Sequence, residues 1–150
     1  AEGIYANRLS PLRMLREQPG PIRAYKIVAV NGEGIYARSN GHTPIVYCVG
    51  ETYEVPDADV DEAHDCGPGL HVASLGWCLR AWQEGYRILV VEFTAADIAA
   101  IPIATDGKFR VRRLTVVREM TEAETGIAQE RRDRAEWEAE NAQIAKGDGQ

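Results

Sequence analysis

Apolar positions recur at strand-like spacing over residues 22–55, and this pattern predicts a sheet rather than a helical bundle. The stretch 22–30 is rich in β-branched and aromatic residues, which favour strands. Asn31-Gly32 follows it directly and is a strong hairpin signal. The strands expected here form an antiparallel meander over 22–30, 34–37, 45–49 and 52–55.

Three more apolar runs, at 70–73, 87–93 and 109–117, extend the expected sheet. The run at 87–93 is the most apolar, so we expect it to be the central strand. Along 109–117 the apolar phase shifts from one set of alternate positions to the other. That shift predicts a β-bulge near Arg112-Arg113.

Helical signals lie before, between and after these strands. Ser10-Pro11 predicts a helix start, Thr94 with Asp97 predicts a short capped turn, and Thr121 with Glu124 forms a capping box. The remaining helix, expected over 74–84, has a single apolar face made of Leu75, Cys78, Leu79 and Trp82.

These elements predict an α+β fold with a mainly antiparallel sheet, one packed central helix and a long C-terminal helix. We expect residues 1–120 to form a single domain that includes the N-terminal helix, and residues 121–150 to form the charged helix and a frayed tail. Pairs of opposite charge at i,i+4 support this last helix, but its apolar face is thin. Trp137 on it is a candidate for binding a partner protein or a second copy, and docking of Trp137 on the sheet is the alternative.

Composition narrows the classes of function. The chain has 150 residues and a formal net charge of −6, which argues against general nucleic-acid binding. No apolar run approaches the roughly 20 residues that cross a bilayer, and residues 1–5 lack a secretory-signal pattern. Three cysteines are typical of a reducing compartment, so we expect a cytoplasmic protein without membrane contact.

The candidate chemistry centres on residues 56–78. The run 56–65 carries five acidic residues without the spacing of a calcium loop, so we interpret it as a solvated acidic loop. Nearby are zinc-type ligands, but their spacing matches no zinc pattern, and we expect neither a metal nor a cofactor. These ligand types are Cys48, His64, Cys66, His71 and Cys78.

Gly67-Pro68-Gly69 predicts a turn that leads into a strand carrying His71 and ending at Ser74. This turn and three neighbouring basic residues form a candidate site for a small anion. The alternatives are that the basic residues are the solvated face of an amphipathic strand and that His71 is a core-edge histidine bonded to the backbone. The basic residues are Lys108, Arg110 and Arg112.

The order of several motifs resembles the core of ADP-ribosyltransferase-like domains. The matching motifs are Tyr25-Lys26, Gly69-Leu70-His71-Val72-Ala73-Ser74 and Val90-Val91-Glu92-Phe93. The resemblance implies a nucleotide-processing enzyme in which His71 contacts a ribose and Tyr25 or Tyr36 stacks on a ring. The catalytic Glu expected near the last strand is absent, since that place reads Asp106-Gly107-Lys108.

The segments 66–74, 90–102 and 108–111 also resemble a small tailed-phage domain of unknown function, with a likeness that covers about residues 24–118. That resemblance implies a phage-type accessory protein that binds a host protein or a small anionic, nucleotide-like ligand in the host cytoplasm. We favour binding over catalysis because no complete catalytic constellation is recognisable. The C-terminal helix is the candidate surface for homo-oligomerisation.

Overall fold

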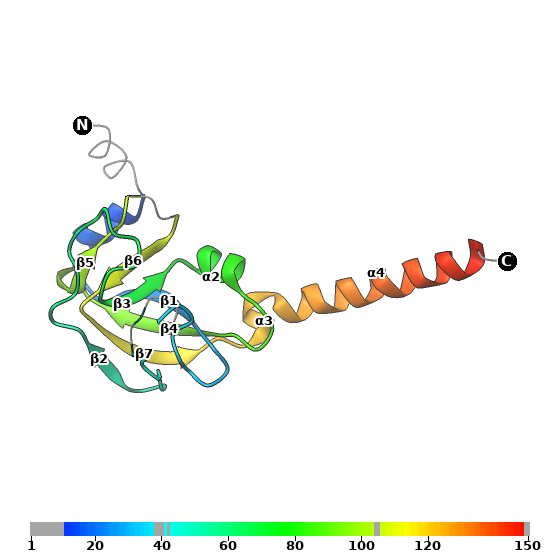
Figure 1. The fold of residues 1–150 in the computed structure, drawn as a ribbon, viewed down its shortest axis with the longest axis horizontal. Coiled ribbons are helices and arrows are strands. Elements are labelled where there is room, and N and C mark those ends of the chain that lie inside the picture. Colours follow the sequence, from blue (N-terminus) through cyan, green and yellow to red (C-terminus); the bar gives the residue numbers. More distant parts are fainter. Residues whose placement is uncertain (1–10, 38–40, 42, 104–105, 149–150) are drawn as a thin grey trace. The chain divides into compact units, whose positions relative to one another are not determined.

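The computed structural model describes residues 11–37, 41, 43–103 and 106–148. The chain divides into two compact units, Ala1–Glu119 and Met120–Gln150, which are treated separately below. The first unit contains the sheet, and the second contains the C-terminal helices (Figure 1).

The first unit is built on a seven-stranded sheet in which every neighbouring pair is antiparallel. The strand order is β2-β7-β4-β1-β3-β6-β5, so β4 and β1 lie near the middle. The predicted mainly antiparallel α+β fold is therefore confirmed. The strands are β1 (Ile22–Val28), β2 (Thr52–Glu54), β3 (Leu70–Ala73), β4 (Arg87–Phe93), β5 (Ile98–Ala100), β6 (Lys108–Val111) and β7 (Arg113–Glu119).

Alternate residues of the central strands supply the hydrophobic core. Ile22, Ala24 and Val28 of β1 point to the same side, where they pack with core residues of β4 and β7. Lys26 stands in this alternating series at a position that would otherwise carry an apolar side chain. In β4 the residues 88–91 are all buried, which confirms that the most apolar strand lies inside the sheet.

The helices are the 3₁₀ helices η1 (Pro11–Glu17) and η2 (Ala95–Asp97) and the α-helices α2 (Leu75–Ala81), α3 (Glu122–Thr125) and α4 (Ile127–Asp148). Three of them, η2, α2 and α3, begin where their capping residues predict. The Ser74 hydroxyl accepts the Trp77 N–H at 3.2 Å, and the Asp97 carboxylate accepts the Thr94 N–H at 2.8 Å. Thr121 and Glu124 form the full capping box, but Gly126 in the left-handed region separates α3 from α4.

Three expectations need correction. The helix at 10–20 is a 3₁₀ helix over its described residues, and Ser10 lies outside them. Helix α2 ends at Ala81, and it buries Cys78, whereas Leu79 is 37% exposed. The seven-residue helix turns Leu79 away from the sheet, so Leu79 does not anchor it.

Of the meander expected over 22–55, the described residues form only the first and last strands, β1 and β2, and these do not pair with each other. After the predicted Asn31-Gly32 turn, the chain makes isolated bridges, Val28 with Gly34 and Glu33 with Val46, and β2 pairs with β7. Side-chain hydrogen bonds satisfy backbone groups of this segment in place of strand pairing. The Tyr53 hydroxyl accepts the Cys48 N–H at 2.7 Å and donates to the Val46 carbonyl at 3.1 Å.

The strand expected over 109–117 is two strands, with the break at Arg112, where the sequence predicts a bulge. The Arg112 N–H donates to the Asp97 carbonyl, and its carbonyl accepts the Val55 N–H, both at 2.7 Å. These bonds lie outside the ladder and let the chain pass between strands. As a result β6 pairs with β3 and β5, while β7 pairs with β2 and β4.

Candidate ligand-binding cavity

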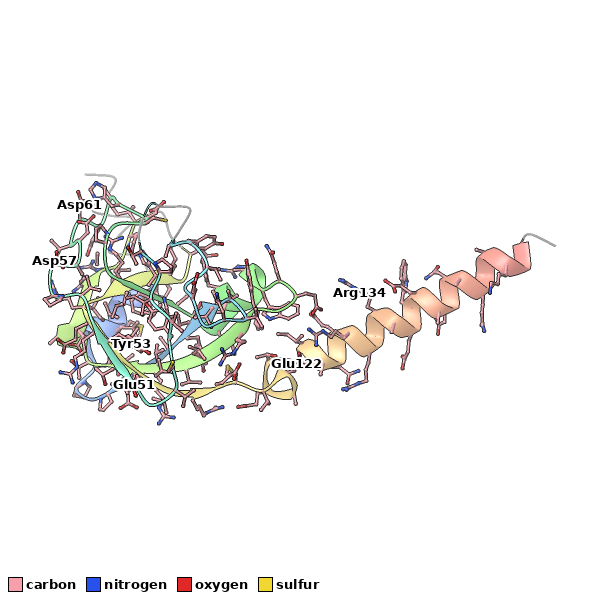
Figure 2. The ribbon with its side chains drawn as sticks, turned by 60° about the horizontal axis from the view of Figure 1, so that its bottom comes forward. Glu51, Tyr53, Asp57, Asp61, Glu122 and Arg134 are labelled. Atoms are coloured by element: carbon pink, nitrogen blue, oxygen red, sulfur yellow. The ribbon has the colours of Figure 1, made fainter. Side chains whose placement is uncertain are left out.

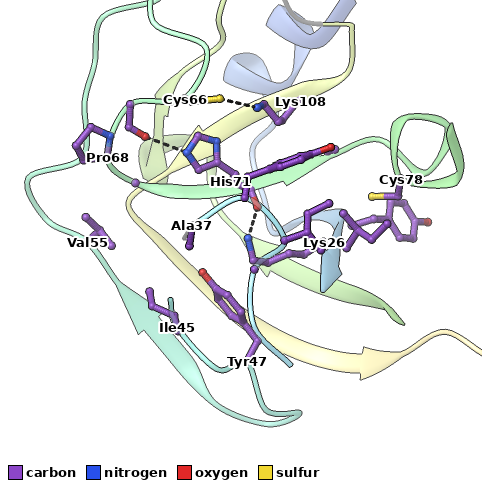
Figure 3. A pocket seen from close by; sticks show the side chains of 18 of the residues that line it. Lys26, Ala37, Ile45, Tyr47, Val55, Cys66, Pro68, His71, Cys78 and Lys108 are labelled. Carbon is purple, nitrogen blue, oxygen red and sulfur yellow. Dashed lines mark hydrogen bonds between the residues drawn. The ribbon is translucent and has the colours of Figure 1, made fainter. Parts of the chain in front are cut away.

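A cavity of about 290 Å³ lies between β1 and β3. Residues 25–27 of β1 and alternate residues of β3 form two of its walls, and α2, the start of β6 and residues from 34–37, 43–47 and 66–69 complete them (Figure 3). The described residues 34–37 and 43–47, which form no named strand, thus have a place in the fold as a wall of the cavity.

The cavity lies where the sheet is least complete. β1 pairs with β4 from Ile22 to Val28, but its register with β3 consists of a single pair, Tyr25 with Ala73. The Lys26 ammonium donates to the His71 carbonyl at 2.6 Å, so a side chain satisfies an acceptor of β3 on this side (Figure 3).

Lys26 is the most unusual residue of the cavity, because a lysine is rarely buried without a carboxylate partner. It is 6% exposed, and its Nζ lies 4.5 Å from the centre of the Tyr47 ring. Burial lowers the pKa of Lys26 to about 8, and nearby Lys108 acts in the same direction, whereas Cys78 opposes it. The amine is therefore held by a carbonyl and a ring face, which are weaker partners for a cation than a carboxylate.

The imidazole of His71 is neutral at physiological pH. Its Nε2 lies 2.9 Å from the Gly67 carbonyl, an acceptor, so the ring proton is on Nε2. Burial lowers the pKa of His71 to about 4, and the positive charge of Lys26 adds to this effect. The other ring nitrogen, Nδ1, is buried and has no hydrogen-bond partner among the described residues. The backbone-bonded histidine that the sequence offered as one alternative describes this geometry.

Lys108 is the second cation of the cavity. Its Nζ lies 3.4 Å from the Cys66 sulfur and 5.8 Å from the centres of both the Tyr36 and Trp77 rings. The two rings meet edge to face, with centroids 6.4 Å apart. Lys108, Tyr36 and Trp77 thus form one cluster of a cation and two aromatic rings.

The described residues that line the cavity offer cations but no carboxylates. Among the described lining residues there is no Asp or Glu, although the whole chain has 23 acidic and 17 basic residues. Cys78 does not supply a negative charge either, since burial raises the pKa of its thiol to about 12. An electropositive apolar pocket in an acidic protein is suited to an anion with an apolar or aromatic body.

Arg110 lies outside this cavity and organises the acidic loop. It is fully buried, and its guanidinium donates to the carbonyls of Asp59 at 2.9 Å, Asp61 at 2.7 Å and His64. The interpretation of Arg110 as part of a solvated strand face is therefore wrong. Gly69 is needed at this packing, because its φ is +146° and a Cβ there would lie 3.2 Å from Arg110 Cδ.

The acidic loop is ordered by its own carboxylates as well as by Arg110. Asp57 and Asp61 lie along it in Figure 2. The Asp59 carboxylate accepts the Asp61 N–H at 2.9 Å and lies 2.6 Å from Nδ1 of His64. The Asp61 N–H, and next the hydrogen bond with His64, lower the pKa of Asp59.

The structure brings some of the predicted site residues together and separates others. Tyr25, Tyr36, His71 and Lys108 all line the cavity. Of the other three in this unit, Ser74 caps α2, Arg110 holds the loop, and Arg112 donates from Nη1 to the Ile98 carbonyl at 3.2 Å. Trp137 belongs to the second unit, where it is 64% exposed on α4.

Sequence reasoning missed Lys26, Tyr47 and Trp77 as site residues. Lys26 carries a usable signal, because a lone lysine at an inward position of an apolar strand is a candidate functional amine. Tyr47 and Trp77 carry no such signal, since their place depends on how segments far apart in the sequence meet.

The five candidate zinc ligands do not assemble. Within the ranges that the structure describes, no group of three or more His, Cys, Asp or Glu side chains is suited to hold a metal ion. Cys48 and Cys66 are exposed, whereas Cys78 is buried on α2. The described cysteine and histidine side chains of the cavity therefore do not form a set of metal ligands.

The helices of the described ranges include none that is long and apolar enough to cross a bilayer. A scan against protein-family models, a search of curated proteins and a search of solved structures each gave no match.

Proposed function

We propose that this protein binds a small organic anion with a flat ring, of the nucleotide-like class, in the cavity between β1 and β3. The main support for this proposal is the set of residues that line the cavity. Two lysines and several aromatic rings converge there, and the described lining residues include no carboxylate. An anionic group would offset the charge of Lys108 and Lys26, and a ring would pack against Tyr36 and Trp77.

The volume limits the size of the ligand. Sites for small molecules commonly enclose about 300–1,000 Å³, and this cavity of about 290 Å³ is at the lower limit. A ligand the size of a mononucleotide or smaller suits it better than a whole dinucleotide. Tyr36 is 45% exposed, so it lies at the solvent side of the cavity, where it can cover a bound ring.

The proposal extends to the cellular role of the protein. The likeness to a small tailed-phage domain supports an accessory protein that binds its ligand or a protein partner in the host cytoplasm. For a protein partner the candidate surface is α4, on which Trp137 and Ile144 are 64% and 61% exposed. Side chains such as Arg134 project from the same helix (Figure 2).

An ADP-ribosyltransferase-like or other nucleotide-processing enzyme is the second candidate. What favours it is that Tyr25 and His71, which that resemblance assigns to the nucleotide, line the same cavity. Against it stands the lack of a carboxylate among the described lining residues, because the resemblance implies a catalytic Glu. Binding without turnover is therefore the function that we favour.

Thermal-shift and calorimetric titrations with AMP, nicotinamide mononucleotide, cyclic mononucleotides and the matching uncharged nucleosides test the binding proposal. A ligand at 100 times its Kd should stabilise the protein by about 2.7 kcal/mol. We expect phosphorylated ligands to bind and nucleosides to bind more weakly. Replacing Lys108→Met should weaken binding about tenfold, whereas Lys146→Met, on the exposed part of α4, should not.

The result that contradicts the proposal is an absence of stabilisation by every anion of the panel at millimolar concentration. Equal effects of the two lysine substitutions would also contradict it, because binding would then follow overall charge. Mass spectrometry of the same samples checks for turnover. Release of nicotinamide from NAD would favour the enzyme over the binding protein.

A further inference from the structure

Lysine is scarce in this chain and concentrated at the cavity. The sequence contains three lysines, Lys26, Lys108 and Lys146, and the first two line the same pocket. The third is exposed on α4, in the other unit. Two amines that converge on one apolar pocket suggest that one of them has a chemical task beyond balancing the charge of a ligand.

We propose that Lys26 Nζ is a nucleophile that captures the carbonyl group of a small anionic aldehyde or ketone as a Schiff base. The inference deepens the binding function proposed above and depends on it, since the same cavity holds the ligand. Lys26 supplies the reacting nitrogen, and Lys108 is the cation that binds the ligand's anionic group.

The reaction balances without a further reagent. The neutral amine adds to the carbonyl carbon, and the resulting carbinolamine loses its oxygen as water together with the two protons that the nitrogen carried. A C=N bond replaces the C=O bond, and nothing is oxidised or reduced. When the imine is protonated, its single N–H can still donate to the His71 carbonyl that Lys26 contacts at 2.6 Å.

The surroundings of Lys26 favour a neutral amine. The ammonium is buried, its contacts are a carbonyl oxygen and the Tyr47 ring, and no carboxylate among the described lining residues stabilises the charge. With its pKa lowered to about 8, about a tenth of the amine is neutral at pH 7. An exposed lysine has a far smaller neutral fraction at this pH.

Neither Cys78 nor His71 competes for the carbonyl. The Cys78 thiol stays protonated, since burial raises its pKa to about 12, and a thiol is a much weaker nucleophile than a thiolate. The His71 proton is engaged with the Gly67 carbonyl at 2.9 Å. A purely structural Lys26, held as a permanent ammonium between His71 and Tyr47, is the alternative that the experiment must exclude.

The test is reductive trapping on the full chain. Pyridoxal 5′-phosphate is a suitable probe, because it joins an aldehyde to a flat ring and a phosphate, and pyridoxal is its matched control without the phosphate. Formaldehyde is a second probe that needs no anion site. After reduction with cyanoborohydride at pH 7, peptide mapping compares labelling of Lys26, Lys108 and Lys146.

We expect Lys26 to be labelled at least about tenfold faster than Lys146 by pyridoxal 5′-phosphate and by formaldehyde at pH 7, because its neutral fraction is about 200 times larger, while burial limits access of the aldehyde. The rate at Lys26 should rise with pH and level off above about 8, whereas the rate at Lys146 should keep rising. Lys26→Arg should remove this labelling, and Lys146→Arg should leave it unchanged. If Lys26→Arg does not fold, the wild-type pH profile and a comparison with denatured protein decide the question.

The outcomes separate this inference from the binding function. If neither pyridoxal 5′-phosphate nor formaldehyde labels Lys26 faster than Lys146, the proposed Schiff-base formation at Lys26 is wrong. If pyridoxine 5′-phosphate, which has no aldehyde, still stabilises the protein, the binding function stands without the capture. If Lys26 reacts rapidly with formaldehyde but no anion binds, the nucleophile is supported and the anion site is wrong.

Discussion

Arg110 gives the sharpest test of how the acidic loop is held over β6. Its side chain is fully buried and donates to three carbonyls of one loop, those of Asp59, Asp61 and His64. Replacing Arg110→Met keeps much of the apolar length of the side chain but removes all three donors and the charge. The three carbonyls then lose their partners where water has little access.

The expected magnitude follows from these contacts. A hydrogen bond from a charged donor contributes about 1.5–3 kcal/mol, and a buried carbonyl left without a donor costs about 1–3 kcal/mol. The three bonds are not additive, because the loop is near the surface and water can reach its carbonyls once it loosens. We therefore expect Arg110→Met to lower the free energy of unfolding by about 4 kcal/mol, slightly less than the sum over the three bonds.

Urea unfolding followed by tryptophan fluorescence measures this loss, and hydrogen exchange locates it. Arg113→Met is the matched control, because Arg113 pairs with Glu54 at 3.5 Å and the two side chains are 57% and 54% exposed. Such a surface pair contributes less than about 1 kcal/mol. Exchange should accelerate over residues 57–66 in the Arg110 variant alone. Equal losses in the two variants, or a loss below about 1 kcal/mol for Arg110→Met, would refute the reasoning.

Three more predictions follow from the same structure. Burial lowers the pKa of His71 to about 4, so between about pH 4 and 6.5 the unfolded chain binds more protons than the folded one, and the free energy of unfolding should rise with pH by up to about 3 kcal/mol. His71→Gln should flatten this slope in urea titrations at several pH values. His64, whose pKa is raised, contributes a slope of the opposite sign that remains in the variant. Cys78→Asp should unfold the first unit, because Cys78 is fully buried on α2. Leu79→Asp should leave the protein folded by circular dichroism, and unfolding of this variant would contradict the packing of α2. If α4 mediates self-association, light scattering should show a mass that falls with dilution and a weaker association after Trp137→Ala; a monomer at every concentration would exclude it.

Local signals in the sequence determined where most elements begin. Ser74, Thr94 and Thr121 begin helices in the structure because a capping side chain needs partners only two or three residues away. The strand 87–93 is central because a nearly continuous apolar run has to be buried on both faces. The position of the break at Arg112 was also encoded locally, in the change of apolar phase, although the split into two strands was not.

The tertiary structure alone decided the site. His71 directly follows the Gly67-Pro68-Gly69 turn and Lys108 begins a later expected strand, so both could be predicted as candidates, but Lys26 could not be joined to them. Its place depends on β1 and β3 separating after a single registered pair.

Arg110 shows the same limit most clearly. Alternation along β6 predicts an exposed side chain, yet the loop at 57–66 covers that face and turns its carbonyls toward the guanidinium. Periodicity reports which residues share a face of a strand, whereas burial depends on what packs against that face. The residues that hydrogen-bond these two side chains lie about 50 positions away from Arg110 and about 45 positions away from Lys26 in the sequence. Only the folded chain brings them together.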